Sequence, residues 1–215
     1  EMCIRDRLRR FFDREVIPYA AQWDEDGHIP KELWPKSAEV GILGLGYPEE
    51  FGGVSEGIDI WYTIILNEEM ARVAVGGVGA TLMVHGIGLP PIINFASDDV
   101  KAMVVPPVLA GTERISLAIT EPGAGSDVAQ LTTTASLEGD HYVVNGSKTY
   151  ITGGMNANWL TTAVRTGGDG AGGISVLLIP TDVEGVSRTA LDKKQGWWCS
   201  DCLLYTSDAA DDTPC

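Results

Sequence analysis

The chain has few basic residues and few cysteines, and its longest apolar run is interrupted. Its 215 residues include 15 Lys and Arg against 30 Asp and Glu, which gives a formal net charge of −15 at pH 7. A protein this acidic repels the phosphates of nucleic acids and of anionic membrane surfaces, so neither is an expected partner. The start of the sequence has no basic segment followed by an apolar one, and no secretory signal is expected.

Only four cysteines occur, and all lie near the ends of the sequence: Cys3, Cys199, Cys202 and Cys215. No disulfide framework is therefore expected to span the fold. Cys199 and Cys202 have the spacing of a redox pair or of half a zinc site, but no second pair and no His lies nearby. We expect no metal site and a reducing compartment, which is the cytoplasm, or the mitochondrial matrix if a transit peptide has been lost.

The most apolar stretch, residues 74–93, contains Thr81, His85 and the pair Pro90-Pro91. A membrane-spanning helix needs about 20 consecutive apolar residues. The stretch fits a buried helix that ends before the prolines better than a span, so no membrane span is expected. His85 is expected to be a core histidine rather than a substrate contact.

Helical periodicity dominates residues 8–113. The clearest segment is 58–74, in which Glu68 and Arg72 are spaced for an i,i+4 ion pair. This half of the chain is expected to be an all-α domain. Further helices are predicted from Leu8, before Gly41, over 75–89 and over 98–109.

From Arg114 the sequence consists of short segments rich in Thr, Val and Ile, separated by turn residues. Asn145-Gly146 is a typical two-residue hairpin signal, and the glycine cluster 167–173 indicates a loop between strands. Regular spacing without helices predicts an antiparallel barrel or sandwich over 114–201, and the fold class is α+β. Residues 1–7 and 202–215 look like non-native sequence and are left out of the expected fold. The predicted strands are 115–120, 132–137, 141–145, 147–152, 159–165 and 174–180.

The segment Thr120–Asp127, TEPGAGSD, contains two glycines, a proline and short polar side chains. Gly123 and Gly125 carry no Cβ, so the chain can adopt positive φ there and let backbone amides approach a bulky polar ligand closely. The Thr120 and Ser126 hydroxyls add hydrogen-bond donors, and Asp127 can close the turn onto its own backbone. Alone, this pattern is also typical of a plain glycine-rich connection with an Asx cap.

A second motif, VVNGSKTYIT, occupies Val143–Thr152. In it, Lys148 is expected to be a solvent-facing hairpin lysine. The two motifs in this order resemble the flavin-binding middle domain of the acyl-CoA dehydrogenases. PEEFGG (48–53) and NEEMAR (67–72) are similar to that family's N-terminal helical domain, so the resemblance covers residues 8–201.

The resemblance implies an FAD-dependent α,β-dehydrogenation of an acyl-CoA thioester, with electrons passing to an electron-transfer flavoprotein. It also implies a homo-oligomer, either a tetramer or a dimer. Ser126 is implied to touch the acyl-CoA ligand in addition to the cofactor. Tyr150 stands where many relatives have tryptophan, and either ring offers a flat face to the flavin. The implied cofactor-binding residues are Leu117, Ile119, Thr120, Gly125, Ser126, Tyr150, Ile151 and Thr152.

The resemblance stops before the catalytic step. The family's glutamate base lies on a C-terminal helical bundle, and no residue here matches it, so no catalytic residue is assigned. The chain as given is expected to bind FAD weakly at best and not to turn over. Two alternatives stay open: a flavoprotein monooxygenase or oxidase on the same scaffold, and a non-catalytic acyl-CoA-binding module without flavin.

Overall fold

The computed structural model describes residues 2–191 and 193–211, which divide into two compact units. Unit 1 consists of Glu1–Met83, Ala102–Glu113 and Lys194–Ser200. Unit 2 consists of Val84–Lys101, Arg114–Lys193 and Asp201–Cys215. The units interleave along the chain, and the sequence-based domain limits of 8–113 and 114–201 stay predictions.

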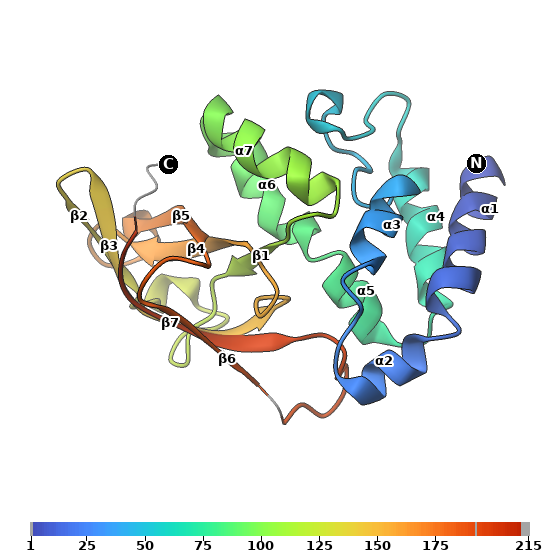
Figure 1. The fold of residues 1–215 in the computed structure, drawn as a ribbon. Helices are drawn as coiled ribbons and strands as arrows, with labels where there is room; N and C mark the ends of the chain where they lie inside the picture. The colour runs from blue at the N-terminus through green and yellow to red at the C-terminus, as the bar shows by residue number, and fades with distance from the viewer. Residues whose placement is uncertain (1, 192, 212–215) are drawn as a thin grey trace. The chain divides into compact units, whose positions relative to one another are not determined.

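Unit 1 is helical, as its periodicity predicted (Figure 1). The first helix begins at Met2, not at Leu8, and its apolar side chains at Leu8 and Phe11 are buried in the core of this unit. Because an apolar row continues through Phe12 and Val16, the chain stays helical there as a π-helix. The elements are α1 (Met2–Phe11), η1 (Phe12–Val16), α2 (Ala20–Asp26), α3 (Leu33–Glu39), η2 (Glu49–Phe51), α4 (Ile60–Ala71) and α5 (Gly76–Leu82).

Helix α4 begins after Asp59, whose side chain accepts a hydrogen bond from the amide of Trp61 at 3.0 Å. The predicted pair between Glu68 and Arg72 is wrong. Glu68 pairs with Arg5 at 2.6 Å, and Arg72 pairs with Glu69 at 3.1 Å. The reason is tertiary, since α1 packs against α4 and supplies arginines that compete with the partner within the helix.

Two further helices are α6 (His85–Phe95) and α7 (Asp98–Leu109). The range of α7 was predicted, but the single helix predicted over 75–89 is two helices, α5 and α6. Moreover, α6 continues past Pro90-Pro91 instead of ending before them. The prolines remove two donors from the helix, and the carbonyls left without these donors belong to Gly86 and Ile87, which are exposed to water. His85 is buried, as expected of a core histidine. By length and composition alone, Gly76–Phe95 could cross a membrane; 44% of its most apolar window is buried.

The strands of unit 2 form one seven-stranded sheet in the order β1-β4-β2-β3-β7-β6, with β5 paired to β4. The predicted helical part followed by a β part is confirmed. However, β1 and β2 each run parallel to β4, so the sheet is mixed rather than wholly antiparallel. The strands are β1 (Ile115–Ala118), β2 (Thr134–Glu138), β3 (His141–Thr152), β4 (Trp159–Arg165), β5 (Ile174–Pro180), β6 (Val186–Ala190) and β7 (Cys202–Asp211).

The predicted hairpin at Asn145-Gly146 is wrong, because β3 runs straight through these residues. Asn145 pairs with Thr134 of β2 on one side and with Asp208 of β7 on the other. Pairing of both residues with β7, and of Asn145 with β2, holds the dipeptide extended, which overrides its local turn preference. The tight turn between β2 and β3 instead lies at Gly139-Asp140, where Gly139 has φ 70°.

Strands β6 and β7 were not predicted. Residues 202–211 had been set aside with the end segment, yet β7 pairs along β3 and β6 (Figure 1). Residues 212–215 of that segment lie outside the described part of the chain. Helix α6 packs on β1, and Gly88 allows the close approach because a Cβ there would lie 3.2 Å from Ile115. The Thr161 hydroxyl on β4 donates to the Gly88 carbonyl at 2.8 Å.

Candidate functional site

The glycine-rich motif forms a tight turn directly after β1. The Glu121 amide donates to the Ala124 carbonyl at 2.8 Å, and the Ala124 amide donates back at 3.2 Å. The Asp127 carboxylate accepts a hydrogen bond from the amide of Ala129 at 3.2 Å, so the predicted closure by Asp127 is confirmed. The turn is thus held at both ends by its own backbone and one side chain.

Of the two properties predicted for the glycines, the structure shows the open backbone and not the positive φ. Neither Gly123 nor Gly125 lies among the residues with positive φ, so the turn does not need glycine for its backbone angles. A Cβ at either position would meet no atom within 4 Å. Glycine is therefore not required there by contacts within the chain, and both backbones are open to a bulky ligand.

The prediction that Lys148 faces solvent is wrong. Its side chain is 0% exposed, and its ammonium donates to Glu121 Oε1 at 2.8 Å and to the Ile119 carbonyl at 3.1 Å. Glu121 also accepts from the amides of Thr132 and Thr133 at 2.6 and 2.9 Å. The signal available in the sequence was that Glu121 and Lys148 carry opposite charges, one in each of the two motifs.

The surroundings of this buried pair favour the ionised form of the Glu121 carboxylate. Burial by itself would raise the pKa of Glu121, but the hydrogen bonds from Lys148, Thr133 and Thr132 outweigh it and lower the pKa to about 2. Burial lowers the pKa of Lys148, and the Glu121 carboxylate opposes that shift. Glu121 is consequently a fixed acceptor and a poor proton acceptor in chemistry.

The second motif presents an aromatic ring on the outside of β3. The pairing of β3 with β7 shifts register between Lys148 and Ile151, and Tyr150 in this bulge has φ 59°. Its side chain is 69% exposed, whereas that of Ile151 is buried in the sheet core. Ile151 can therefore offer a ligand only its backbone.

The structure brings the two motifs side by side. The amide of Thr149 donates to the carbonyl of Thr120 at 2.8 Å, which joins the end of the β1 segment to β3 next to Tyr150. Leu117, Ile119, Thr120 and Thr152 are partly exposed, and Gly125 and Ser126 are exposed. This hydrogen bond links Thr120 to Thr149 directly. The other predicted site residues lie on β1, on β3 or in the segment and turn that follow β1.

The polar side chains of the predicted site divide into two sets. Glu121 and Lys148 are saturated with internal partners. By contrast, the hydroxyls of Thr120, Ser126 and Thr152 make no hydrogen bond with any residue that the structure describes. Free hydroxyls, open glycine backbone and an exposed flat ring are the groups that a flavin with its pyrophosphate requires, so these residues fit FAD.

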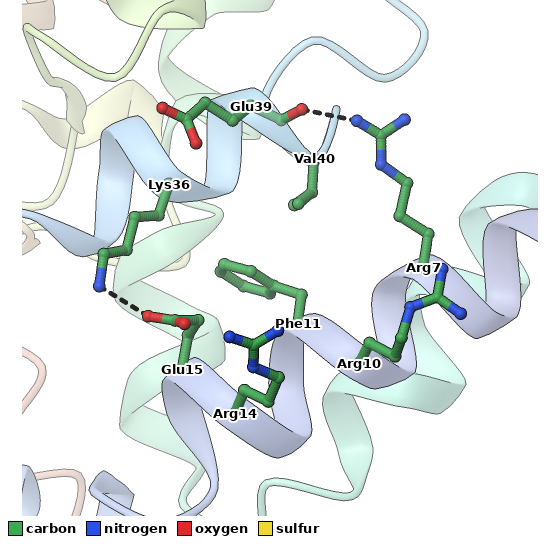
Figure 2. Close-up of a pocket in the computed structure, with 8 residues that line it drawn as sticks. All are labelled: Arg7, Arg10, Phe11, Arg14, Glu15, Lys36, Glu39 and Val40. Carbon is green, nitrogen blue, oxygen red and sulfur yellow. Dashed lines mark hydrogen bonds and ion pairs between the residues drawn. The ribbon is translucent and has the colours of Figure 1, made fainter.

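A cavity of about 340 Å³ in unit 1 is lined mainly by charged side chains (Figure 2). Lys36 pairs with Glu15 at 2.6 Å, and Arg7 donates to the Glu39 carbonyl at 2.7 Å. None of the predicted site residues lines this cavity, so it gives no support to the flavin site. The lining residues are Arg7, Arg10, Phe11, Arg14, Glu15, Lys36, Glu39 and Val40.

Cys199 of the Cys-x-x-Cys spacing packs in the core of unit 1. Burial and the neighbouring Asp24 carboxylate raise the pKa of its thiol to about 12, so the nucleophilic thiolate is disfavoured. Among residues 2–191 and 193–211, no group of three or more His, Cys, Asp or Glu side chains is arranged to hold a metal ion.

Comparison with known proteins gives a single family. Residues 1–112 match the N-terminal domain of acyl-CoA dehydrogenases, and residues 116–202 match their middle domain. An acyl-CoA dehydrogenase of Alternaria alternata is 34% identical over 202 residues, which are 88% of this chain and 47% of that protein.

Solved structures agree with these matches. A probable acyl-CoA dehydrogenase of Mycobacterium abscessus superposes with a TM-score of 0.92 at 44% identity, over 98% of this chain and 56% of that one. An acyl-CoA dehydrogenase of Bacillus anthracis, solved with FAD, gives 0.86 at 30% identity, over 98% of this chain and 36% of that one. The chain spans about half the length of the curated relatives it matches. It belongs to the acyl-CoA dehydrogenase family and contains that family's N-terminal and middle domains.

Proposed function

We propose that this chain contributes the flavin-binding half of an FAD-dependent dehydrogenase that converts an acyl-CoA thioester to the trans-2-enoyl-CoA. The observation that carries the proposal is the open turn after β1, held next to the exposed Tyr150. Bound FAD would supply the acceptor for the substrate β-hydride. An electron-transfer flavoprotein would then take the electrons. We further propose that the complete protein is a homo-oligomer and that its compartment is the cytoplasm.

The chain's own residues have distinct roles in this proposal. The turn backbone at Gly125 and the hydroxyls of Thr120 and Ser126 bind polar groups of FAD, with Ser126 also touching the acyl-CoA. The ring of Tyr150 covers one apolar face of the flavin and keeps water away from it. Thr152 places a further hydroxyl at the end of the same strand.

The step that removes the α-proton needs a carboxylate or another base with a pKa close to neutral. Two buried glutamates of this chain, Glu69 and Glu121, have pKa values lowered to about 2. Glu68 is exposed and paired with Arg5. None of these three glutamates is suited to this step. We propose that the base comes from polypeptide outside these 215 residues, and acyl-CoA oxidation by the chain as given would contradict this.

Replacing Gly125 by valine tests the flavin site. Because a Cβ at Gly125 meets no atom of the chain within 4 Å, the melting temperature is expected to stay unchanged. The branched side chain would stand between the backbone and the ligand, so the FAD dissociation constant should rise about tenfold or more. Quenching of flavin fluorescence on titration measures this constant.

Gly168→Val is the matched control, since Gly168 is also exposed and open to solvent. It should change neither the melting temperature nor FAD binding. Equal FAD affinity in Gly125→Val and in the wild type would show that the turn is not part of the flavin site.

A further inference from the structure

We infer that Lys148 and Glu121 are positioning residues for the proposed flavin site, which this inference presupposes. Their buried ion pair holds the turn after β1 and the bulge of β3 in one arrangement. Neither side chain reaches solvent, with 0% of Lys148 and 3% of Glu121 exposed. The pair therefore cannot touch FAD directly and must act through its neighbours.

The Glu121 carboxylate gathers three separate segments of unit 2. It accepts from Lys148 on β3, and from the Thr132 amide and hydroxyl and the Thr133 amide on the approach to β2. Glu121 itself lies in the turn after β1. Four hydrogen bonds use about the full acceptor capacity of a carboxylate, so all three segments are held by one group.

Lys148 links β3 to the segment that leads from β1 into the turn. Its ammonium donates to the Ile119 carbonyl at 3.1 Å as well as to Glu121. The backbone bond between Thr149 and Thr120 then closes a ring of contacts around the ion pair. Consequently, residues 119–121 cannot shift relative to β3 without breaking a buried charged contact.

Two predicted flavin-binding residues lie next to this pair in sequence, Thr120 with its free hydroxyl and Tyr150 with its exposed ring. Thr120 precedes Glu121, and Tyr150 follows Lys148 by two residues, at a φ of 59° that a tyrosine rarely adopts. Buried ion pairs contribute little net stability compared with apolar replacements. Strained backbone at a site persists where the surroundings fix it. Together, these facts favour a role in fixing geometry over a role in stability alone.

The experiment compares Lys148→Met and Lys148→Arg with the wild-type chain, at a temperature where circular dichroism shows all three to be folded. Two quantities are measured. Hydrogen–deuterium exchange without FAD reports on the Thr149 amide and on residues 120–126, and flavin fluorescence gives the FAD dissociation constant. Lys36→Met is the control, because it removes the same charge from an exposed ion pair in unit 1.

For Lys148→Met we expect faster exchange at Thr149 and an FAD dissociation constant raised about tenfold, equivalent to ~1.4 kcal/mol. Lys148→Arg should recover part of both, and Lys36→Met should change neither. If Lys148→Met does not fold, the same comparison is made between Lys148→Arg and the wild type, with a smaller loss in the same direction expected. Faster exchange with unchanged FAD affinity in Lys148→Met would overturn the inference and leave the flavin site standing, whereas an unchanged FAD affinity in Gly125→Val as well would overturn both.

Discussion

Gly146→Ala is expected to lower the free energy of unfolding of unit 2 by about 3 to 4 kcal/mol, through steric overlap and an unfavourable φ. Gly146 has φ 153°, and a Cβ there would lie 2.5 Å from Thr133 Oγ1 and 2.7 Å from Thr133 Cα. Backbone atoms cannot rotate away from such a contact, so β2 and β3 would have to separate locally. Thr133 also donates its amide to Glu121, and the shift would therefore reach the ion pair.

The measurement is chemical denaturation of the chain followed by far-ultraviolet circular dichroism. Gly172→Ala is the control, because Gly172 has no neighbour within 4 Å of a Cβ and no positive φ. Its transition should coincide with that of the wild type. An unchanged midpoint in Gly146→Ala would mean that β2 and β3 are not held as closely as the structure has them.

Gly146 also shows what sequence reasoning misses in a sheet. Asn-Gly is a strong local turn signal, and the real turn lies at Gly139-Asp140 instead. Which glycine turns and which stays extended depends on the strands that pair on both sides, and β7 was not foreseen. The glycine was needed, but for a close approach to Thr133 and not for a turn.

Helices were more predictable because their period is local. The range of α7 and the buried apolar row from Leu8 to Val16 follow directly from spacing. In contrast, the extension of α6 past its prolines depends on solvent reaching two carbonyls, which no spacing shows. The fold class and the range of α7 were therefore accessible from the sequence, while the ends of α6 and the strand pairing were not.

At the candidate site, the motifs located the outward-facing groups and missed the buried ones. Thr120 and Tyr150 were singled out, and the structure joins their segments through the Thr149 amide. Lys148 was assigned to solvent because a lysine in a strand usually faces water. Its burial follows from Glu121, which is 27 residues away in sequence and comes next to it only in the fold.

Unit 1 contains a comparable charged cluster around Glu69, from which we expect a loss of stability in acid. The Glu69 side chain is 1% exposed and accepts hydrogen bonds from Arg9, at 2.8 and 3.0 Å, and from Arg5 and Arg72, at 3.2 and 3.1 Å. The hydrogen bonds from Arg9 and the other arginines outweigh burial and lower the pKa of Glu69 to about 2. Its ionised form is thus bound more strongly in the folded chain than in the unfolded one.

Glu69→Gln is expected to lower the free energy of unfolding of unit 1 by about 3 kcal/mol at pH 7, because it leaves three arginines around a neutral group. That is the lower end for a broken buried pair, since the arginine side chains are 35% to 48% exposed and keep part of their hydration. Tryptophan fluorescence during urea denaturation measures the loss. Glu68→Gln is the control, because Glu68 is 54% exposed and its pair with Arg5 is worth about 1 kcal/mol or less.

The pH dependence gives the second test of the same cluster. A carboxyl whose pKa is lowered on folding contributes its full stability above its unfolded pKa of 4.5 and loses it as the pH falls toward the folded value of about 2. The wild type should therefore lose stability over this window faster than Glu69→Gln, and the two transitions should converge near pH 2. Glu121 titrates in the same window in both proteins, so it cancels in the difference. A gap between the two proteins that stays constant from pH 7 to pH 2 would show that Glu69 acts through packing and not through its charge.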